Sequence, residues 1–360
     1  MPGTLANEHR ALVSTLPPGR SELRLALFIV LISAAVFLTA IPFAKVPLPQ
    51  YPSFILFYDA AVVVTDLATA FLLIGQFGAL RAPALLVLSC GYVFTAFLAI
   101  PHALTFPGLF SATGLLGAGP QSTAWIYMFW HGGFPLFVIA YAMLKGEGRE
   151  TRWPRGRLLV AVLLGSAALV AILSGLTMLA TTGKDLLPAI MVGNHYSPAM
   201  IFTVSSVWTF SLVALIVLWL RRPHTVLDLW LVVVMCAWLF NIALAAVFNG
   251  GRFDFGFYAG RIYGLLAVSF VLIALLIENS WLSLRLAREY EGRVQALRRN
   301  QDKARSGPPQ GGNRTAEPAM RQKFATSTIA LSGFSAPPCL ENLNPFSLNS
   351  FSQASATAES

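Results

Sequence analysis

Eight apolar stretches fill nearly all of the chain between Leu23 and Ser280, and each is long enough to cross a lipid bilayer. A helix needs about 20 apolar residues to span the hydrocarbon core. Inside that core a segment must satisfy its own backbone hydrogen bonds, which an α-helix does. We therefore predict an all-α integral membrane fold, an eight-transmembrane-helix bundle. The stretches are Leu23–Ile41, Phe54–Gln76, Ala84–His102, Ser122–Leu144, Leu158–Ala180, Ala199–Leu220, Leu227–Phe248 and Phe257–Glu278.

The composition agrees with a membrane protein, because 56% of the residues are hydrophobic and only 11% are charged. In soluble proteins the charged residues alone make up about a quarter. The formal net charge of +9 would suit a nucleic-acid partner, but the basic residues gather in alternate loops. The rich set is Arg10, Arg20, Arg24, Arg81, Lys145 to Arg157, Arg221, Arg222 and Arg285 to Arg299, and the poor set is Lys45, Lys184, Arg252 and Arg261.

Because loops rich in Lys and Arg stay in the cytoplasm, this asymmetry predicts a multi-pass protein with both termini cytoplasmic. Membrane topology and contact with anionic lipid then explain the positive net charge, and we predict no nucleic-acid partner. Residues 1–22 form a cytoplasmic N-terminal segment, and residues 23–280 form the membrane domain. The first apolar run has full spanning length and no small-residue cleavage site, so we expect it to stay as an anchor.

The segment 281–304 becomes charged while it keeps an apolar stripe at helical spacing. We predict a cytoplasmic signalling helix that continues the last span, and a homodimer through this helix would be the simplest way to carry a signal. A stalk lying on lipid head groups is the alternative. Residues 305–360 are rich in Ser, Pro, Asn, Gln and Ala without a periodic apolar pattern, which predicts a disordered tail.

Polar side chains within the spans are the first candidates for a functional site, because they are costly in hydrocarbon. Asp59 and Asp66 lie seven residues apart, on one face of the second span. Asp66 and His131 lie at similar depth, and an Asp–His pair could act as a switch for protons or a cation. His102 ends the third span. The alternatives are that Asp66 and His131 only hold helices together, and that Asp59 is hydrated from outside.

The loops with few basic residues, on the predicted outer side, are rich in Pro, Gly and aromatic residues, and we expect them to be ordered. Gln121, Trp125 and Trp130 follow the longest of these loops and complete the set of ligand-binding or switch candidates. An aromatic belt at the membrane interface explains each ring taken alone. A cluster of rings beside such turns could also form a lid over an apolar cavity.

The segment from Pro42 to Lys145 contains motifs that resemble those of the membrane-associated sensor (MASE) domains of the fourth class. The resemblance rests on Pro42-Phe43-Ala44, Asp66, Gly75-Gln76-Phe77, Gly91-Tyr92, Pro101 to Gly108, Gly119-Pro120-Gln121, Trp125 and Phe129-Trp130-His131. It implies a multi-helix input module of a bacterial signalling protein in the inner (plasma) membrane. Such modules usually feed a histidine kinase or a diguanylate cyclase, in two-component or cyclic-di-GMP signalling.

The sequence after Ala304 departs from that pattern, since it holds no cyclase signature, no His-box and no ATP lid. We expect a module that lacks its output domain and acts on a separate signalling protein. The tail could also be an out-of-frame translation of an output domain, which the nucleotide sequence would test. No catalytic motif is present, so we expect no enzyme, cofactor or metal.

A small-molecule or ion transporter that uses the acidic face of the second span is the main alternative function. The absence of internal repeats and of paired Gly/Pro-broken helices weighs against it. An intramembrane enzyme or haem protein ranks third, because His102 and His131 differ too much in depth to share an iron.

Overall fold

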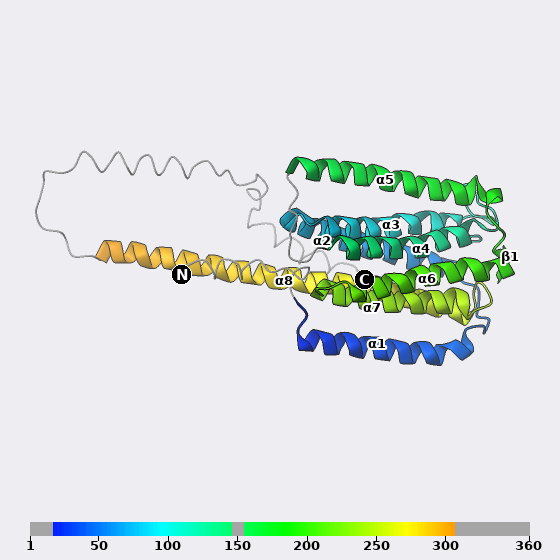
Figure 1. Cartoon of the computed structure of the whole chain (residues 1–360), viewed down its shortest axis with the longest axis horizontal. Helices are drawn as coiled ribbons and strands as arrows, with labels where there is room; N and C mark the ends of the chain where they lie inside the picture. Colours follow the sequence, from blue (N-terminus) through cyan, green and yellow to red (C-terminus); the bar gives the residue numbers. More distant parts are fainter. Residues whose placement is uncertain (1–16, 146–154, 307–360) are drawn as a thin grey trace, which may run out of the picture. The chain divides into compact units, whose positions relative to one another are not determined.

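The computed structural model describes residues 17–145 and 155–306, and in this part of the chain eight long helices alternate in direction (Figure 1). Each predicted stretch falls on one helix, and α8 alone continues far beyond its predicted stretch, so the predicted membrane fold is confirmed. The helices are α1 (Arg20–Ala40), α2 (Ser53–Leu80), α3 (Pro83–Thr105), α4 (Ser122–Leu144), α5 (Arg155–Thr181), α6 (Pro198–Leu220), α7 (Val226–Ile242) and α8 (Phe255–Ser306).

The predicted segments beyond the bundle are described only in part. The signalling helix predicted at residues 281–304 forms the last part of α8, which runs without a break to Ser306. The chain forms two compact units that divide between Glu289 and Tyr290. The tail prediction lies outside the described residues from 307 onward, and so does most of the N-terminal segment.

Helices α2, α3, α4, α6 and α7 form the centre of the bundle, where each packs against the next, and α1 packs on α7 while α5 packs on α3 and α4. In lipid, apolar side chains gain little by leaving the membrane for a protein core, so close fit and polar contacts hold the helices together. The outward faces are accordingly apolar. On α2, for example, Phe57 and Phe71 are each about three-quarters exposed at 74% and 75%.

Three glycines at every fourth position let the start of α8 approach its neighbours closely. A Cβ atom on Gly260 would lie 2.9 Å from the Asn241 carbonyl oxygen and 2.7 Å from the Ala245 Cβ atom. A Cβ atom on Gly264 would lie 2.6 Å from the Tyr58 hydroxyl, and one on Gly256 would overlap the Leu244 carbonyl oxygen. Small residues at this spacing are a common means of close helix contact in membranes.

The connections α1–α2, α3–α4, α5–α6 and α7–α8 meet at one end of the bundle, which we call the hairpin end (Figure 1). A short antiparallel hairpin of β1 (Met191–Val192) and β2 (His195–Tyr196) lies there. Three short helices also lie at this end: η2 (Ile41–Phe43), η3 (Lys184–Leu186) and the π-helical turn η4 (Ala243–Val247).

Backbone hydrogen bonds join these loops to one another. The Arg252 N–H donates to the Asn194 carbonyl at 2.7 Å, and the Leu48 N–H donates to the Phe253 carbonyl at 2.9 Å. Gln121 adds side-chain bonds, because its Oε1 accepts from the Ile190 and Met191 N–H groups at 2.8 and 2.7 Å. The loops at the hairpin end are therefore ordered, as the sequence predicts.

Candidate functional site

A buried Asp–His pair lies between α2 and α3 near the hairpin end. The Asp59 Oδ2 atom lies 2.7 Å from the His102 Nδ1 atom, and the two residues are only 2% and 1% exposed. His102 lies in the last turn of α3, packed against the rings of Phe106, Tyr127 and Trp130. The alternative that Asp59 is an interfacial residue hydrated from outside is therefore wrong for this structure.

The structure does not pair Asp66 with His131, so that part of the predicted switch is corrected. Asp66 accepts a short hydrogen bond from the Thr95 hydroxyl of α3. His131 instead has two partners of its own: its Nδ1 atom donates to the Tyr127 carbonyl at 2.9 Å, and its Nε2 atom accepts from the Asn241 side-chain amide at 3.0 Å. Equal depth in the membrane does not make two residues face each other, because the direction of each side chain around its helix decides that.

A chain of polar contacts runs through the core around His131. Asn241 on α7 also accepts from the Tyr127 hydroxyl at 3.2 Å, and the Trp238 indole donates to the His131 carbonyl at 3.2 Å. Stacked rings surround the imidazole, with the Tyr127 centroid at 3.8 Å and the Trp238 centroid at 4.8 Å. This cluster joins α4 to α7, as the helix-holding alternative predicts for His131.

The remaining candidates of the sequence lie at the start of α4 or in its core. Trp130 is 1% exposed and packs between Tyr58 and His102, so it does not belong to an interfacial belt. Trp125 donates its indole N–H to the Pro188 carbonyl at 3.0 Å. Gln121 ties the α5–α6 connection to α4 and thereby holds the hairpin in place.

Two arginines, which in the sequence indicate topology, complete the site. Arg261 lies near the start of α8 and is 4% exposed, and Arg252 lies in the α7–α8 connection. Both line one small cavity of about 30 Å³ together with His102, Tyr127 and Tyr196. An arginine within a spanning segment is by itself a sign of function, and Arg261 carried that signal in the sequence.

The pKa of the Arg252 guanidinium is lowered to about 10, mainly by burial and also by the nearby charge of Arg261, while Tyr196 opposes the shift. Arg252 therefore keeps its positive charge at neutral pH. The Tyr196 hydroxyl donates to the Ala245 carbonyl in the π-helical turn at 2.6 Å, and burial raises its pKa. The cavity is thus lined by two cationic side chains and by several aromatic rings.

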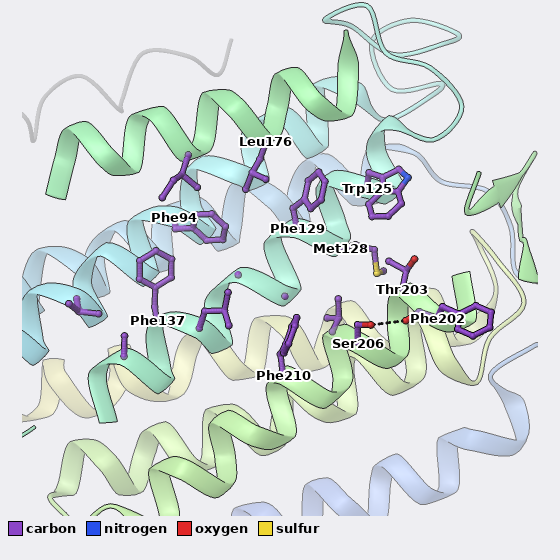
Figure 2. A pocket seen from close by; sticks show the side chains of 17 residues that line it. Phe94, Trp125, Met128, Phe129, Phe137, Leu176, Phe202, Thr203, Ser206 and Phe210 are labelled. Carbon is purple, nitrogen blue, oxygen red and sulfur yellow. Dashed lines mark hydrogen bonds between the residues drawn. The ribbon is translucent and has the colours of Figure 1, made fainter. Parts of the chain in front are cut away.

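A second, larger cavity is apolar and lies between α3, α4, α5 and α6 (Figure 2). Its volume is about 770 Å³, and none of the 17 side chains that line it is titratable. Phe94, Phe129, Phe137 and Phe210 form much of its wall in Figure 2, with Trp125 at one end. Its two hydroxyls, on Thr203 and Ser206, donate to carbonyls of their own helix. Such a surface suits hydrocarbon and offers no acid–base chemistry.

The described residues hold no group of three or more His, Cys, Asp or Glu side chains that could bind a metal ion. What the site offers is charge, in a buried Asp–His pair, the buried Arg261 and the partly buried Arg252, and both arginines lie against aromatic rings. Arg261 lies 3.6 Å from the Phe257 ring centroid and 5.3 Å from that of Tyr127. This arrangement can hold a charged group, and it connects α2, α3, α4 and α8.

Residues 49–281 match a protein-family model, MASE4, described as a membrane-associated sensor, integral membrane domain. These residues comprise α2 to α7, the spanning part of α8 and all of the polar side chains described above. Comparison with curated proteins and with solved structures finds no significant match.

Proposed function

The chain belongs to the MASE4 family of membrane-associated sensor domains, and from this we propose that it is the sensory input module of a bacterial signal-transduction protein. We propose further that it serves a histidine kinase or diguanylate cyclase pathway from the inner membrane, with both termini in the cytoplasm. It acts without catalysis of its own. The observation that carries this proposal is the family match across the whole site.

The uninterrupted helix α8 supports a mechanism for the relay. Its first turns hold Arg261 and the close glycine contacts, and its last part extends beyond the spanning segment Phe255–Ser280. A helix is stiff over this length, so a small shift or rotation at the hairpin end reaches the other end of α8. The site and the output segment thus share one structural element.

The last part of α8 also supports a parallel homodimer. Tyr290, Val294 and Leu297 follow the alternating spacing of four and three residues that coiled coils use. Tyr290 and Leu297 are 71% and 64% exposed in the single chain, which leaves an apolar seam for a second copy. A change in the packing of such a seam is a simple way to switch an output domain on or off.

The test is a fusion of residues 1–306 to a diguanylate cyclase catalytic domain, expressed in cells that make no other cyclic dinucleotide. Cyclic-dinucleotide output is compared between the native fusion and the Asp59→Asn and His102→Gln variants across small anions, pH and redox conditions. We expect output that depends on a condition in the native fusion and loses that dependence in the variants. Asp185→Asn, an exposed carboxylate at the same end, is the matched control.

Membrane levels of every fusion are measured alongside, so that loss of protein is not taken for loss of signalling. Output that is flat in every condition would contradict the proposal. Uptake of a solute by proteoliposomes of the native chain, abolished by Asp59→Asn, would point to the transporter instead.

A further inference from the structure

Two arginines, Arg252 and Arg261, line the small cavity at the hairpin end. In the described part of the chain neither Arg252 nor Arg261 forms an ion pair with a carboxylate. The Asp59 Oδ2 atom contacts His102 while its Oδ1 atom has no partner among the described residues, and the Asp254 Oδ2 atom accepts the Gly250 N–H at 3.0 Å. Burying a charge without an ion-pair partner is costly, and Arg261 is buried while Arg252 is partly buried, so a bound counter-ion would stabilise both.

Hydrogen-bond donors of both arginines are also unused. The Arg261 Nη1 atom donates to the Phe257 carbonyl at 3.0 Å, but its buried Nε atom has no partner among the described residues. The Arg252 Nη2 atom is likewise buried without a partner in that part of the chain. Buried donors are rarely left unsatisfied, and those that are call for an explanation such as a bound ion.

The size of the cavity limits what can fill it. A volume of about 30 Å³ has room for a few non-hydrogen atoms. Aromatic and apolar side chains close the remaining walls, among them Phe106, Phe257 and Met191. The fork of a guanidinium group matches the two oxygens of a planar oxyanion better than it matches a spherical ion.

We propose that Arg252 and Arg261 bind a small planar oxyanion in this cavity, a carboxylate or an ion of the same shape such as nitrate or bicarbonate. The role of this anion as the stimulus rests on the proposed function, whereas its binding does not. Binding would join the α7–α8 connection to the first turns of α8, because one arginine comes from each. The hairpin would report the same event, since the Arg252 N–H is bonded to Asn194 and Met191 lines the cavity.

The local backbone supports a built site. Phe253, directly after Arg252, adopts a φ of 68°, a left-handed conformation that costs energy for a bulky side chain. The π-helical turn η4, whose Ala245 lines the cavity, lies in the chain just before the same connection. Strained residues and π-helical turns are both enriched at functional sites.

Binding to the purified full-length chain is the direct test, because it needs no output domain. Calorimetric titrations with sodium formate, acetate, nitrate and bicarbonate are compared with chloride and phosphate at constant ionic strength. We expect saturable binding of at least one planar oxyanion. Arg252→Gln and Arg261→Gln should each weaken it about tenfold or more, since each removes charge-assisted hydrogen bonds. Lys45→Gln, an exposed cation at the same end, should leave it unchanged.

Arg252→Lys and Arg261→Lys keep the charge if the glutamine variants fail to fold, and they should also weaken binding because lysine lacks the planar fork. No saturable binding by the native chain, binding of phosphate or chloride alone, or binding that survives both sets of arginine variants would each overturn the proposal. The cyclase fusion could respond to other conditions although the purified chain binds no anion. That result would support the sensor function and exclude this anion as its ligand.

Discussion

At the scale of single residues, specific partners hold the buried polar groups: Asp59 contacts His102, and Asp66 bonds to Thr95. Asp59, Asp66, His102 and His131 were all predicted from their position within apolar stretches, and all four are buried. The pairing was predicted from depth along the helix, and depth says nothing about rotation of one helix relative to another. Asp66 in fact bonds to the Thr95 hydroxyl, and nothing in the sequence distinguishes Thr95 from other threonines as its partner.

A double-mutant cycle distinguishes the observed pair from the predicted one. We expect Asp59→Asn and His102→Gln to show a coupling energy above about 1 kcal/mol, because the two groups are buried and in direct contact. Each single variant should be destabilising, since it leaves the other group buried without its partner. Unfolding in detergent micelles followed by circular dichroism gives the four free energies of unfolding.

The cycle of Asp66→Asn with His131→Gln is the matched comparison, because these residues share no hydrogen-bond partner. Their effects should add to within about 0.5 kcal/mol. Strong coupling in this second cycle, with additivity in the first, would restore the pairing predicted from sequence.

The Arg252 guanidinium makes anion binding depend on pH in a defined direction. Its pKa is lowered to about 10, so the charged form is present below that pH and is lost as the pH rises through it. The affinity for nitrate, which stays ionised throughout, should be constant between about pH 6 and 8 and fall near pH 10. Titrations of the native chain and of Arg252→Gln test this, and the variant should lack the fall near pH 10.

At the scale of elements, hydropathy predicted every spanning helix, because length and apolar composition alone decide whether a segment crosses lipid. It could not predict the hairpin, since strands of two residues are too short for a periodic pattern. The charged sequence after the last span predicts a helix that continues it, and the structure has one helix from Phe255 to Ser306. The glycines at 256, 260 and 264 recur at every fourth position, a spacing that indicates close helix packing.

The close approach of α8 to the π-helical turn should be sensitive to a single methyl group. Gly260→Ala places a Cβ atom 2.9 Å from backbone atoms of both Asn241 and Ala245, neither of which can turn aside. We expect a loss of about 1–3 kcal/mol in the free energy of unfolding, the usual cost of overpacking. Gly175→Ala on α5 meets nothing within 4 Å and should show no loss. Equal stability of the two variants would mean that α8 does not approach α7 this closely.

At the scale of the whole molecule, the distribution of charge predicts which end of the bundle faces the cytoplasm. Arg20, Arg81, Lys145 and Arg221 lie at the ends of helices opposite the hairpin end. Lys145 is partly engaged there, because its Nζ atom lies 2.8 Å from the Asp228 Oδ2 atom between α4 and α7. The other basic groups are available to contact anionic lipid, and they predict that this end faces the cytoplasm.

Thiol labelling in intact cells tests this orientation and decides which compartment supplies the anion. In a background with Cys90, Cys236 and Cys339 changed to alanine, Val192→Cys places a thiol on the exposed β1 strand, and Arg299→Cys places one on α8 beyond the span. A membrane-impermeant maleimide should label Val192→Cys in intact cells and Arg299→Cys only after permeabilisation, because basic loops resist translocation. The opposite pattern would turn the hairpin end toward the cytoplasm. The arginine cavity would then sample an intracellular anion, and α8 would carry its signal outward.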